Sequence, residues 1–343
     1  MNLDNTILPP EPSMDYFPDI VGQPITKRIL SFYIDSFEKS EILPNLFIVG
    51  QRGQGKTMVA TNIARNLRSK TLGKVKPLLT INCATLKNVR QFVENICLPY
   101  IQDQYVTVFF DEIHLMPEPI QTCLLTVMNP NKHNRNTLRF EDFNIEFDFT
   151  KVSFILATTD PQKVISPLKD RCKMVHLEEY TYSDLGEIVE QNCEDLTFAP
   201  DVLKEIASVC RGNARNATLM AKDNLMQFAK KENLHDIGHA EWDRLQCTLG
   251  ILPLGLENTE LHVLRILESR GTCSLTNLSA VTGLSANSIR AEFELYLLKH
   301  GLMRVAQGGR QITKEGQFYL KKLENKCFDK NLNLAHEGVT IEK

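Results

Sequence analysis

The segment Gly50-Gln51-Arg52-Gly53-Gln54-Gly55-Lys56-Thr57 fits the phosphate-binding pattern G-x-x-x-x-G-K-S/T. It follows the apolar run Leu46-Phe47-Ile48-Val49, which is typical of a buried strand, and it opens a stretch to about Leu67 that is predicted to be helical. Glycines let backbone N–H groups turn toward phosphate oxygens, and the helix N-terminus adds positive potential. We therefore expect a nucleoside triphosphate here, with Lys56 on the β- and γ-phosphates and the Thr57 hydroxyl on Mg²⁺.

A second motif supplies two carboxylates. The apolar run Val106–Phe110 ends in Asp111-Glu112, the Walker-B arrangement in which a strand delivers acidic residues beside a P-loop. Asp111 is expected to hold Mg²⁺ through water, and Glu112 to activate the attacking water as general base. The two motifs together predict hydrolysis of ATP, because a nucleotide sensor has no need of a general base.

The order of apolar runs along the chain predicts the fold class. Runs rich in β-forming residues at 46–49, 78–81, 106–110 and 152–157 alternate with helical patterns, so we expect an α/β core with a parallel sheet covered on both faces. From Tyr182 to about Leu249 the spacing is entirely helical. Pro253 and Gly255 indicate a linker. Three helical segments and a hairpin that turns at Gly308-Gly309 then predict a winged helix-turn-helix.

The predicted organisation is a flexible arm (1–15), an α/β nucleotide-binding domain (16–180), an all-helical lid (181–252), a winged-helix domain (253–325) and a tail (326–343). The nine cysteines include no Cys-x-x-Cys, which argues against a zinc module and a disulfide scaffold. No apolar run can span a bilayer and no signal segment begins the chain, so we expect a soluble cytoplasmic protein without a membrane partner. The net charge of -3 favours nucleic acid only if positive charge is concentrated locally.

Several segments of the chain resemble AAA+ ATPases, and most closely the RuvB family of Holliday-junction branch-migration motors. The resemblance begins near Asp19, includes Asp111-Glu112-Ile113-His114, and continues to about Leu323. It implies an AAA+ fold that uses ATP and Mg²⁺. The Walker motifs are specific for NTPases in general, and the winged domain in this position narrows the resemblance to RuvB.

The resemblance also implies catalytic roles outside the two motifs. Thr159 follows a strand where this family keeps its sensor 1 residue, and it would orient the lytic water. Arg171 ends a stretch similar to the one that bears the RuvB arginine finger, and it would reach the γ-phosphate held by a neighbouring subunit. Arg215 lies in a segment similar to the start of the sensor 2 helix. The residues expected to take part in catalysis are Lys56, Asp111, Glu112, Thr159, Arg171 and Arg215.

Nucleotide contacts are implied at further positions. Phe17–Gln23 is similar to the segment that lies against adenine in these proteins, and Tyr180 is expected beside the same base. The metal is expected on Thr57 and Asp111. The full set of expected nucleotide contacts is Ile20, Val21, Gly50, Gly53, Gln54, Gly55, Lys56, Thr57, Met58, Tyr180 and Arg215.

The winged segment is the candidate DNA-binding region. Arg304 and Arg310 flank its tip, where Gly308 and Gly309 permit close approach to a phosphate. In RuvB-like proteins the wing touches the DNA backbone, so sequence-independent and salt-sensitive binding is implied. Two alternatives stay open: these charges are ordinary solvated side chains, or the winged helix docks another protein.

The chain departs from the RuvB pattern between the Walker-B acids and Thr158, where RuvB has a β-hairpin that grips its partner RuvA. Asn144–Phe149 matches the returning strand by alternation, but the outgoing strand, Thr137–Phe140, is expected to be short. The tip lacks glycine, and Asn129–Asn136 is predicted to be a loop. Whether a RuvA-type partner exists is therefore open.

Three functions remain in competition. The leading one is an ATP-driven ring motor, a homo-oligomer of hexameric form, that moves branched duplex DNA in recombination and repair. A clamp-loader subunit is the second, because Leu156–Lys163 resembles bacterial clamp-loader ATPases; the absence of zinc-binding cysteines after the P-loop argues against it. The third is an ATP-switched origin-binding or helicase-loading protein, which also combines an AAA+ domain with a winged helix.

Overall fold

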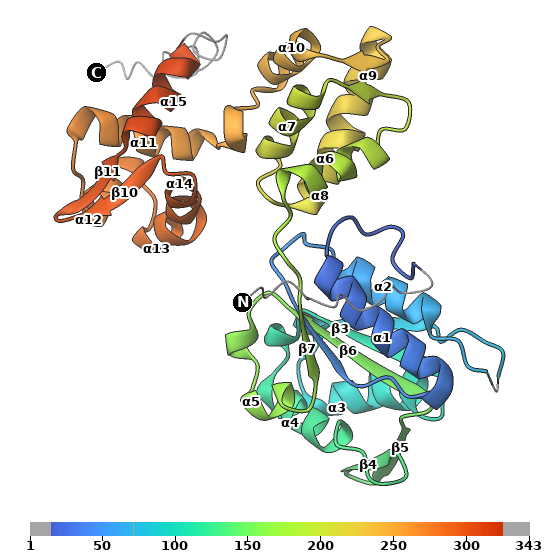
Figure 1. Ribbon diagram of the computed structural model, residues 1–343. Coiled ribbons are helices and arrows are strands. Elements are labelled where there is room, and N and C mark those ends of the chain that lie inside the picture. Colours follow the sequence, from blue (N-terminus) through green and yellow to red (C-terminus); the bar gives the residue numbers. More distant parts are fainter. Residues whose placement is uncertain (1–14, 71, 325–343) are drawn as a thin grey trace, which may run out of the picture. The chain divides into compact units, whose positions relative to one another are not determined.

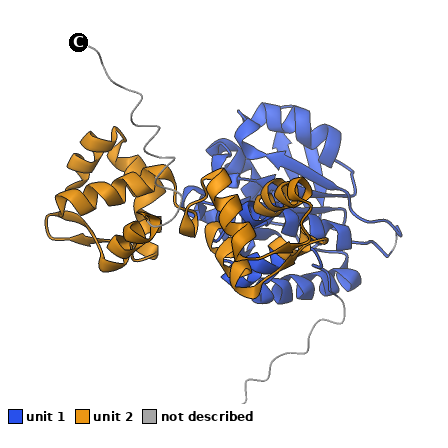
Figure 2. Ribbon diagram, turned by 90° about the horizontal axis from the view of Figure 1, so that it is seen from above, with its two compact units in different colours: residues 1–188, 212–218 blue, residues 189–211, 219–343 orange. Residues whose placement is uncertain are grey.

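The structure is a computed structural model that describes residues 15–70 and 72–324 (Figure 1). The predicted tail, and all of the predicted arm except Asp15, lie outside the described residues. Contacts divide the chain into two compact units (Figure 2). The first runs to Ile188 and also includes Gly212–Thr218, whereas the second comprises Val189–Arg211 and the residues from Leu219 onward. Most of the predicted lid therefore shares a unit with the winged-helix domain.

The first unit is built on a five-stranded parallel sheet with the strand order β2-β3-β6-β1-β7. Its strands are β1 (Leu46–Val49), β2 (Leu78–Asn82), β3 (Val106–Asp111), β6 (Val152–Thr158) and β7 (Lys173–His176). The predicted parallel α/β core is confirmed. β7 was not predicted from the sequence, because Met174 is exposed and only Val175 is buried, so β7 lacks the continuous apolar run of β1, β3 and β6.

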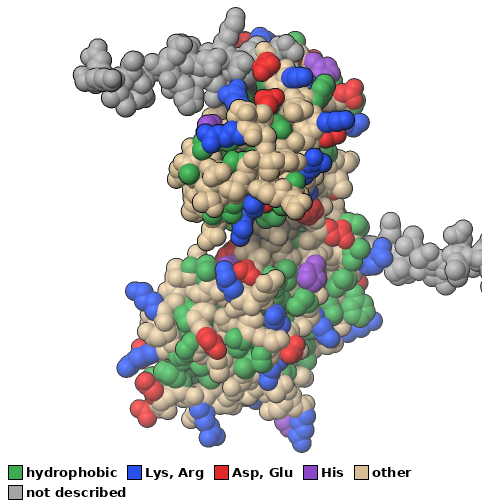
Figure 3. All heavy atoms as spheres, turned by 90° about the vertical axis from the view of Figure 1, so that its left-hand side faces the viewer, with side chains coloured by type: hydrophobic (Ala, Val, Ile, Leu, Met, Phe, Trp, Pro, Cys, Tyr) green, Lys and Arg blue, Asp and Glu red, His purple; other side chains and the backbone are tan. Residues whose placement is uncertain are grey.

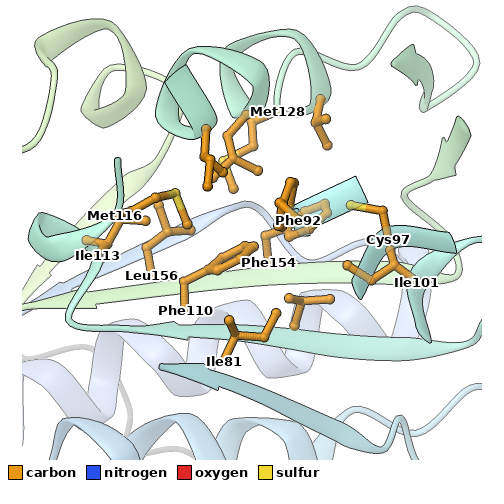
Figure 4. Close-up of a cluster of buried hydrophobic side chains, with 14 of the residues drawn as sticks. Ile81, Phe92, Cys97, Ile101, Phe110, Ile113, Met116, Met128, Phe154 and Leu156 are labelled. Atoms are coloured by element: carbon orange, nitrogen blue, oxygen red, sulfur yellow. The ribbon is translucent and has the colours of Figure 1, made fainter. Parts of the chain in front are cut away.

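Helices cover both faces of this sheet. Successive strand residues point to opposite sides, so neighbouring residues of one strand pack in different layers. Phe109 and Ile155 pack in the layer of α1 (Pro24–Ser40) and α2 (Lys56–Asn66), whereas Phe110 and Phe154 pack in the layer of α3 (Val89–Phe92) and α4 (Glu118–Val127). The rings of Phe110 and Phe154 are stacked with centroids 6.3 Å apart, near Phe92 (Figure 4). The helical segments of this unit are α1 (Pro24–Ser40), α2 (Lys56–Asn66), η1 (Cys83–Thr85), α3 (Val89–Phe92), its π-helical continuation η2 (Val93–Ile101), η3 (Ile113–Leu115), α4 (Glu118–Val127), η4 (Pro161–Lys163) and α5 (Ser166–Lys169).

The carboxyl ends of the strands define the edge of the sheet at which a ligand is expected. Val49 at the end of β1 lies opposite Thr158 of β6, and Asn82 at the end of β2 lies opposite Asp111 of β3. The P-loop, the Walker-B acids and the residue predicted as sensor 1 therefore follow neighbouring strands and meet at this edge.

The hairpin between β3 and β6 is complete, which corrects the prediction of a short outgoing strand. β4 (Arg135–Phe140) begins within the predicted loop and pairs along its whole length with β5 (Phe143–Asp148). The turn does not need glycine, because Glu141 itself adopts a left-handed conformation with φ 49°. Leu138, Ile145 and Phe147 are buried on the inner face, and the outer face carries the exposed polar residues Thr137, Arg139 and Glu146.

The second unit is mainly helical. The stretch predicted to be all-helical also contains two short parallel strands, β8 (Thr197–Phe198) and β9 (Asp236–Ile237), which were missed because two residues carry no periodic signal. The predicted wing is present as the antiparallel pair β10 (Met303–Ala306) and β11 (Gly309–Ile312). The helical segments from residue 182 onward are α6 (Tyr182–Gln191), α7 (Pro200–Val209), α8 (Ala214–Leu219), η5 (Met220–Leu225), α9 (Met226–Glu232), α10 (His239–Leu249), η6 (Pro253–Gly255), α11 (Asn258–Arg270), α12 (Leu275–Thr282), α13 (Ala286–Ser288), η7 (Ile289–Glu294), α14 (Leu295–Lys299) and α15 (Lys314–Glu324).

No helix within the described ranges is sufficiently long and apolar to cross a membrane.

Candidate nucleotide site

The backbone of the P-loop is held in a shape that only glycine permits at two positions. Gly53 and Gly55 have φ values of 79° and 87°, in the left-handed region that side chains disfavour. A Cβ atom at Gly53 would also lie 2.1 Å from Oδ1 of Asn213, which leaves no room for one. Gln54 is buried, and its Oε1 accepts a hydrogen bond from the backbone N–H of Gln51 at 2.6 Å. The loop is thus shaped by its own side chain and by Asn213.

Lys56 places its ammonium group at the centre of the loop. Its Nζ donates to the backbone carbonyls of Gly50 and Gln51 at 3.0 and 3.3 Å, and lies 3.8 Å from Oε1 of Glu112. Burial lowers the pKa of Lys56, and the attraction of Glu112 and Asp111 opposes that change. Arg215 also lowers this pKa by repulsion, which places its positive charge near Lys56. The ammonium is therefore held by weak partners that an anion can replace.

The two residues predicted to hold the metal lie together. Oγ1 of Thr57 is 3.5 Å from Oδ2 of Asp111, and Oδ1 of Asp111 accepts a hydrogen bond from the N–H of Glu112 at 3.1 Å. A hydroxyl and a carboxylate are the hard oxygen ligands that Mg²⁺ prefers, and Mg²⁺ commonly takes only one or two carboxylates together with substrate phosphates and water. These side chains therefore fit Mg²⁺.

Glu112 contacts two other residues outside the P-loop, Thr159 and His114. Its Oε2 lies 3.4 Å from the backbone N and 3.3 Å from Oγ1 of Thr159, the residue predicted as sensor 1. The same oxygen lies 3.3 Å from Nδ1 of His114, which is also 3.0 Å from Oγ1 of the buried Thr158. The sequence analysis gave His114 no role. Its place two residues after Glu112, in the turn η3, was the only signal available.

The residues expected near adenine differ in exposure. Tyr180 is buried and its hydroxyl donates to the carbonyl of Gln54 at 3.3 Å; burial raises the pKa of this tyrosine. Ile20 and Val21 are buried, whereas Met58 is 48% exposed. Base contacts by Ile20, Val21 and Met58 stay predictions.

The segment that contains Arg215 touches the P-loop through its backbone and through a residue that the sequence analysis missed. The N–H of Arg215 donates to the carbonyl of Gly53 at 3.3 Å, and Nδ2 of Asn213 donates to the carbonyl of Arg52 at 3.1 Å. Oδ1 of Asn213 in turn accepts from the N–H of Arg215 at 2.9 Å. Asn213 therefore links the start of α8 to the loop.

Arg171 is not one of the side chains gathered around Lys56. Its Nη1 donates to the carbonyl of Pro167 at 2.7 Å, and no carboxylate in the described part of the chain pairs with it. A half-buried guanidinium without an acidic partner retains its charge for an external anion. Its role toward a neighbouring subunit stays a prediction.

The two arginines predicted to contact DNA are placed differently. Arg304 is exposed, and its guanidinium donates to Oε1 of Gln311 at 3.1 to 3.2 Å. Arg310 instead points inward and pairs with both carboxylate oxygens of Glu294 at 3.0 to 3.2 Å. Basic side chains on the face shown in Figure 3 are interspersed with acidic ones. The placement therefore favours Arg304 as a DNA contact and not Arg310.

Comparisons with known proteins identify both the ATPase core and the winged domain. Residues 46–179 match the AAA family, the ATPase family associated with various cellular activities, and residues 253–321 match the RuvB C-terminal winged helix domain. The Holliday junction branch migration complex subunit RuvB of Latilactobacillus sakei is 27% identical over 320 residues, with 88% of this chain and 89% of that protein covered. The corresponding subunit of Wolbachia pipientis wMel is 26% identical over 315 residues, with 88% and 91% covered.

The solved structure of the Thermotoga maritima RuvB Holliday junction branch migration motor has the same fold. It covers 90% of this chain and 99% of its own, with a TM-score of 0.68 and 22% sequence identity. The chain therefore contains an AAA domain and, after it, a C-terminal winged helix domain of the RuvB type.

Proposed function

We propose that this protein is a Mg²⁺-dependent ATPase that assembles as a hexameric ring and moves duplex DNA, so that Holliday junctions migrate during recombination and repair. The observation that carries the proposal is that one chain joins P-loop and Walker-B residues that lie close together to a winged helix domain of the RuvB type. Similarity to RuvB subunits along 88% of the chain supports the same function.

Hydrolysis would proceed from the geometry around Glu112. Lys56 would exchange its contacts with the carbonyls of Gly50 and Gln51 for the β- and γ-phosphate oxygens. Thr57 and Asp111 would hold Mg²⁺, which when bound neutralises charge on those phosphates. The Glu112 carboxylate would take a proton from water as the water oxygen bonds to the γ-phosphorus and the bond to the β–γ bridging oxygen breaks.

Three residues outside the two motifs would help to position the water and the nucleotide. Thr159 lies within 3.3 Å of the carboxylate, so its hydroxyl would share the same water molecule. Arg215 would add positive charge on the nucleotide side, in keeping with its electrostatic effect on Lys56. Arg171 would complete the site from the neighbouring subunit, since it has no carboxylate partner among the described residues of its own chain.

A mixing experiment tests the shared site. Arg171→Ala should abolish hydrolysis, and so should Lys56→Ala, because each removes a positive charge from the transferred phosphoryl group. Mixtures of the two variants should recover part of the activity, since some interfaces would then combine an intact finger with an intact P-loop. Absence of recovery at every mixing ratio would contradict a site shared between subunits.

Dissociation of a synthetic four-way DNA junction tests the motor itself. We expect ATP-dependent dissociation by the purified protein, and the same assay with an added RuvA-type protein shows whether such a partner is needed. ATP hydrolysis without junction movement in either case would contradict the proposal. Assembly with a ring-shaped clamp would instead indicate a loader, and sequence-specific duplex binding would indicate an initiator.

A further inference from the structure

Arg211 lies between the last turn of α7 and the segment that touches the P-loop. Its backbone is left-handed, with φ 57°. Its guanidinium pairs with both carboxylate oxygens of Glu260 at 2.8 Å, in the first turn of α11. Glu260 has an exposed fraction of 0%, and beside this pairing its carboxylate accepts a hydrogen bond from the backbone N–H of Glu257 at 2.8 Å, so Arg211 is the cation that compensates its buried charge. The bond therefore joins the residue before Gly212 to the first helix of the winged domain.

Two further contacts fix the same guanidinium. Its Cζ lies 3.8 Å from the ring centroid of Tyr296, a cation–π geometry, and Nη1 donates to the carbonyl of Gly255 at 3.2 Å. The hydroxyl of Tyr296 donates to the carbonyl of Leu254 at 2.6 Å. The stretch at Pro253–Gly255, which the sequence analysis predicted to be a linker, is thus fastened from two sides.

Gly255 shows how closely this turn fits against α7. A Cβ atom there would lie 2.3 Å from the carbonyl oxygen of Val209, and the residue has φ 65°, so a side chain is excluded on both grounds. A second tyrosine, Tyr319 of α15, donates to the carbonyl of Pro253 at 2.8 Å. Close packing and paired charges therefore make the joint between α7 and the winged domain stiff.

On the other side of Arg211, the chain contacts the nucleotide loop. Asn213 donates to the carbonyl of Arg52, and Arg215 donates to that of Gly53. Only Gly212, with φ 71°, separates the clamped Arg211 from Asn213. A change in the P-loop backbone that displaces Asn213 therefore reaches Arg211 through a single intervening residue.

We propose that Arg211 and Glu260 are positioning residues that make the winged domain follow the Asn213–Arg215 segment as the nucleotide changes. The inference rests on the proposed motor function. It adds the route by which a structural change at the nucleotide would be transmitted to the winged domain. A carboxylate without solvent cannot release its cation cheaply, so this joint moves as a whole when Asn213 is displaced.

The test compares Glu260→Gln with Glu257→Gln in the full chain. Both residues face Arg211, but Glu257 is 65% exposed and lies 3.9 Å away, so its loss should have little effect. We expect Glu260→Gln to keep its DNA-free ATPase rate within about twofold and to lose at least about tenfold of the stimulation by DNA. Arg211→Lys, which keeps the charge but not the paired geometry, should lose an intermediate amount.

Hydrogen exchange supplies a readout that does not depend on DNA. In the wild-type chain, addition of a non-hydrolysable ATP analogue should change exchange at residues 252–260, and Glu260→Gln should abolish that change. A purely structural role would lower thermal stability but leave the nucleotide response intact. Retention of both the DNA stimulation and the exchange response in Glu260→Gln would overturn the proposal.

The two proposals fail in different ways. If the wild-type chain shows no stimulation by DNA, the motor function is contradicted, and the exchange experiment still decides on the joint. If Glu260→Gln does not fold, Tyr296→Phe weakens the same joint at a second point, because it keeps the ring under Arg211 and removes the hydroxyl bond to Leu254. An unchanged response in folded Tyr296→Phe and Arg211→Lys would count against coupling through this joint.

Discussion

The nucleotide site and the winged domain use their cations in opposite ways. Lys56 is buried, yet it makes only carbonyl contacts and a long 3.8 Å approach to Glu112. Arg310 of the wing pairs with both oxygens of Glu294, and the two side chains are only 13% and 9% exposed. The first cation is free to exchange its partners for a phosphate, whereas the second is already committed to holding its own domain together. The availability of a positive charge is therefore decided by its partners and not by its position near a turn.

Glu112→Gln breaks the nucleotide site most sharply. The change keeps the shape of the side chain but removes the base, so we expect hydrolysis to fall by about 10² to 10⁴-fold while ATP binding persists. Single-turnover hydrolysis and equilibrium nucleotide binding measure the two effects separately. Glu118→Gln, at an exposed position of α4, is the matched control. Normal turnover in Glu112→Gln would remove Glu112 from the role of base.

Arg310→Ala tests whether the wing arginine serves stability. The substitution leaves the nearly buried Glu294 without its partner, so the free energy of unfolding should fall by about 3 kcal/mol. Urea denaturation measures this loss, and the double variant with Glu294→Gln should be less destabilised than the sum of the single changes. Arg290→Ala, at an exposed position, should change stability by no more than about 0.5 kcal/mol. Equal effects of the two arginines would contradict the distinction drawn above.

Lys76 is another buried cation, and its side chain donates to a hydroxyl. It is 1% exposed, and Nζ donates to Oγ of Ser153 at 3.0 Å while facing the rings of Phe37 and Tyr105. Burial lowers its pKa from 10.5 to about 7, and the attraction of Glu41 and Asp148 only partly opposes this. The folded state thus disfavours the charged form.

The sign of the resulting pH dependence follows from the lowered pKa. Between about pH 7 and 10.5 the Lys76 side chain is protonated in the unfolded chain but not in the folded chain. The free energy of unfolding therefore increases as the pH rises through this range, by up to about 1.4 kcal/mol per pH unit. Lys76→Met should therefore be more stable than wild type at pH 7, and its advantage should shrink toward pH 10. Urea denaturation across this range measures the difference, with the exposed Lys74→Met as control. A difference that does not vary with pH would contradict the assignment.

Arg304→Ala should have the smallest effect. Its guanidinium contacts only the exposed side of the wing, so we expect a change in stability of no more than about 0.5 kcal/mol. DNA affinity should weaken equally for different sequences, and the slope of log affinity against log salt should fall by about 1. A salt titration of duplex binding measures this slope. An unchanged slope would place the DNA contact elsewhere in the protein.

The sequence predicted best where a single residue type is enforced by backbone shape or by a long apolar run. Gly53 and Gly55 could be recognised because the loop leaves no alternative, and β1, β3 and β6 because both of their faces are buried. β7 was missed because it is defined by its pairing with β1. Asn213 was missed because its role depends on a contact with the distant P-loop residue Arg52.

Pairing between side chains was the least predictable feature. Nothing in the local sequence distinguishes Arg304 from Arg310. The two differ because only Arg310 pairs with Glu294, which lies in a helical segment outside the wing. The same holds for Arg211, whose partner Glu260 is distant in the sequence. Site residues fixed by the motifs could therefore be proposed from spacing, whereas the use of each arginine needed the folded chain.

The β4–β5 hairpin has a buried inner face and an exposed outer face, and the two faces are constrained differently. Its inward residues, among them Ile145 and Phe147, belong to the core of the ATPase unit, whereas Thr137, Arg139 and Glu146 are exposed, with Glu146 paired to Arg135 at 3.1 Å. Substitution of the exposed set can therefore change the chemistry of this surface without disturbing the packing of the ATPase core.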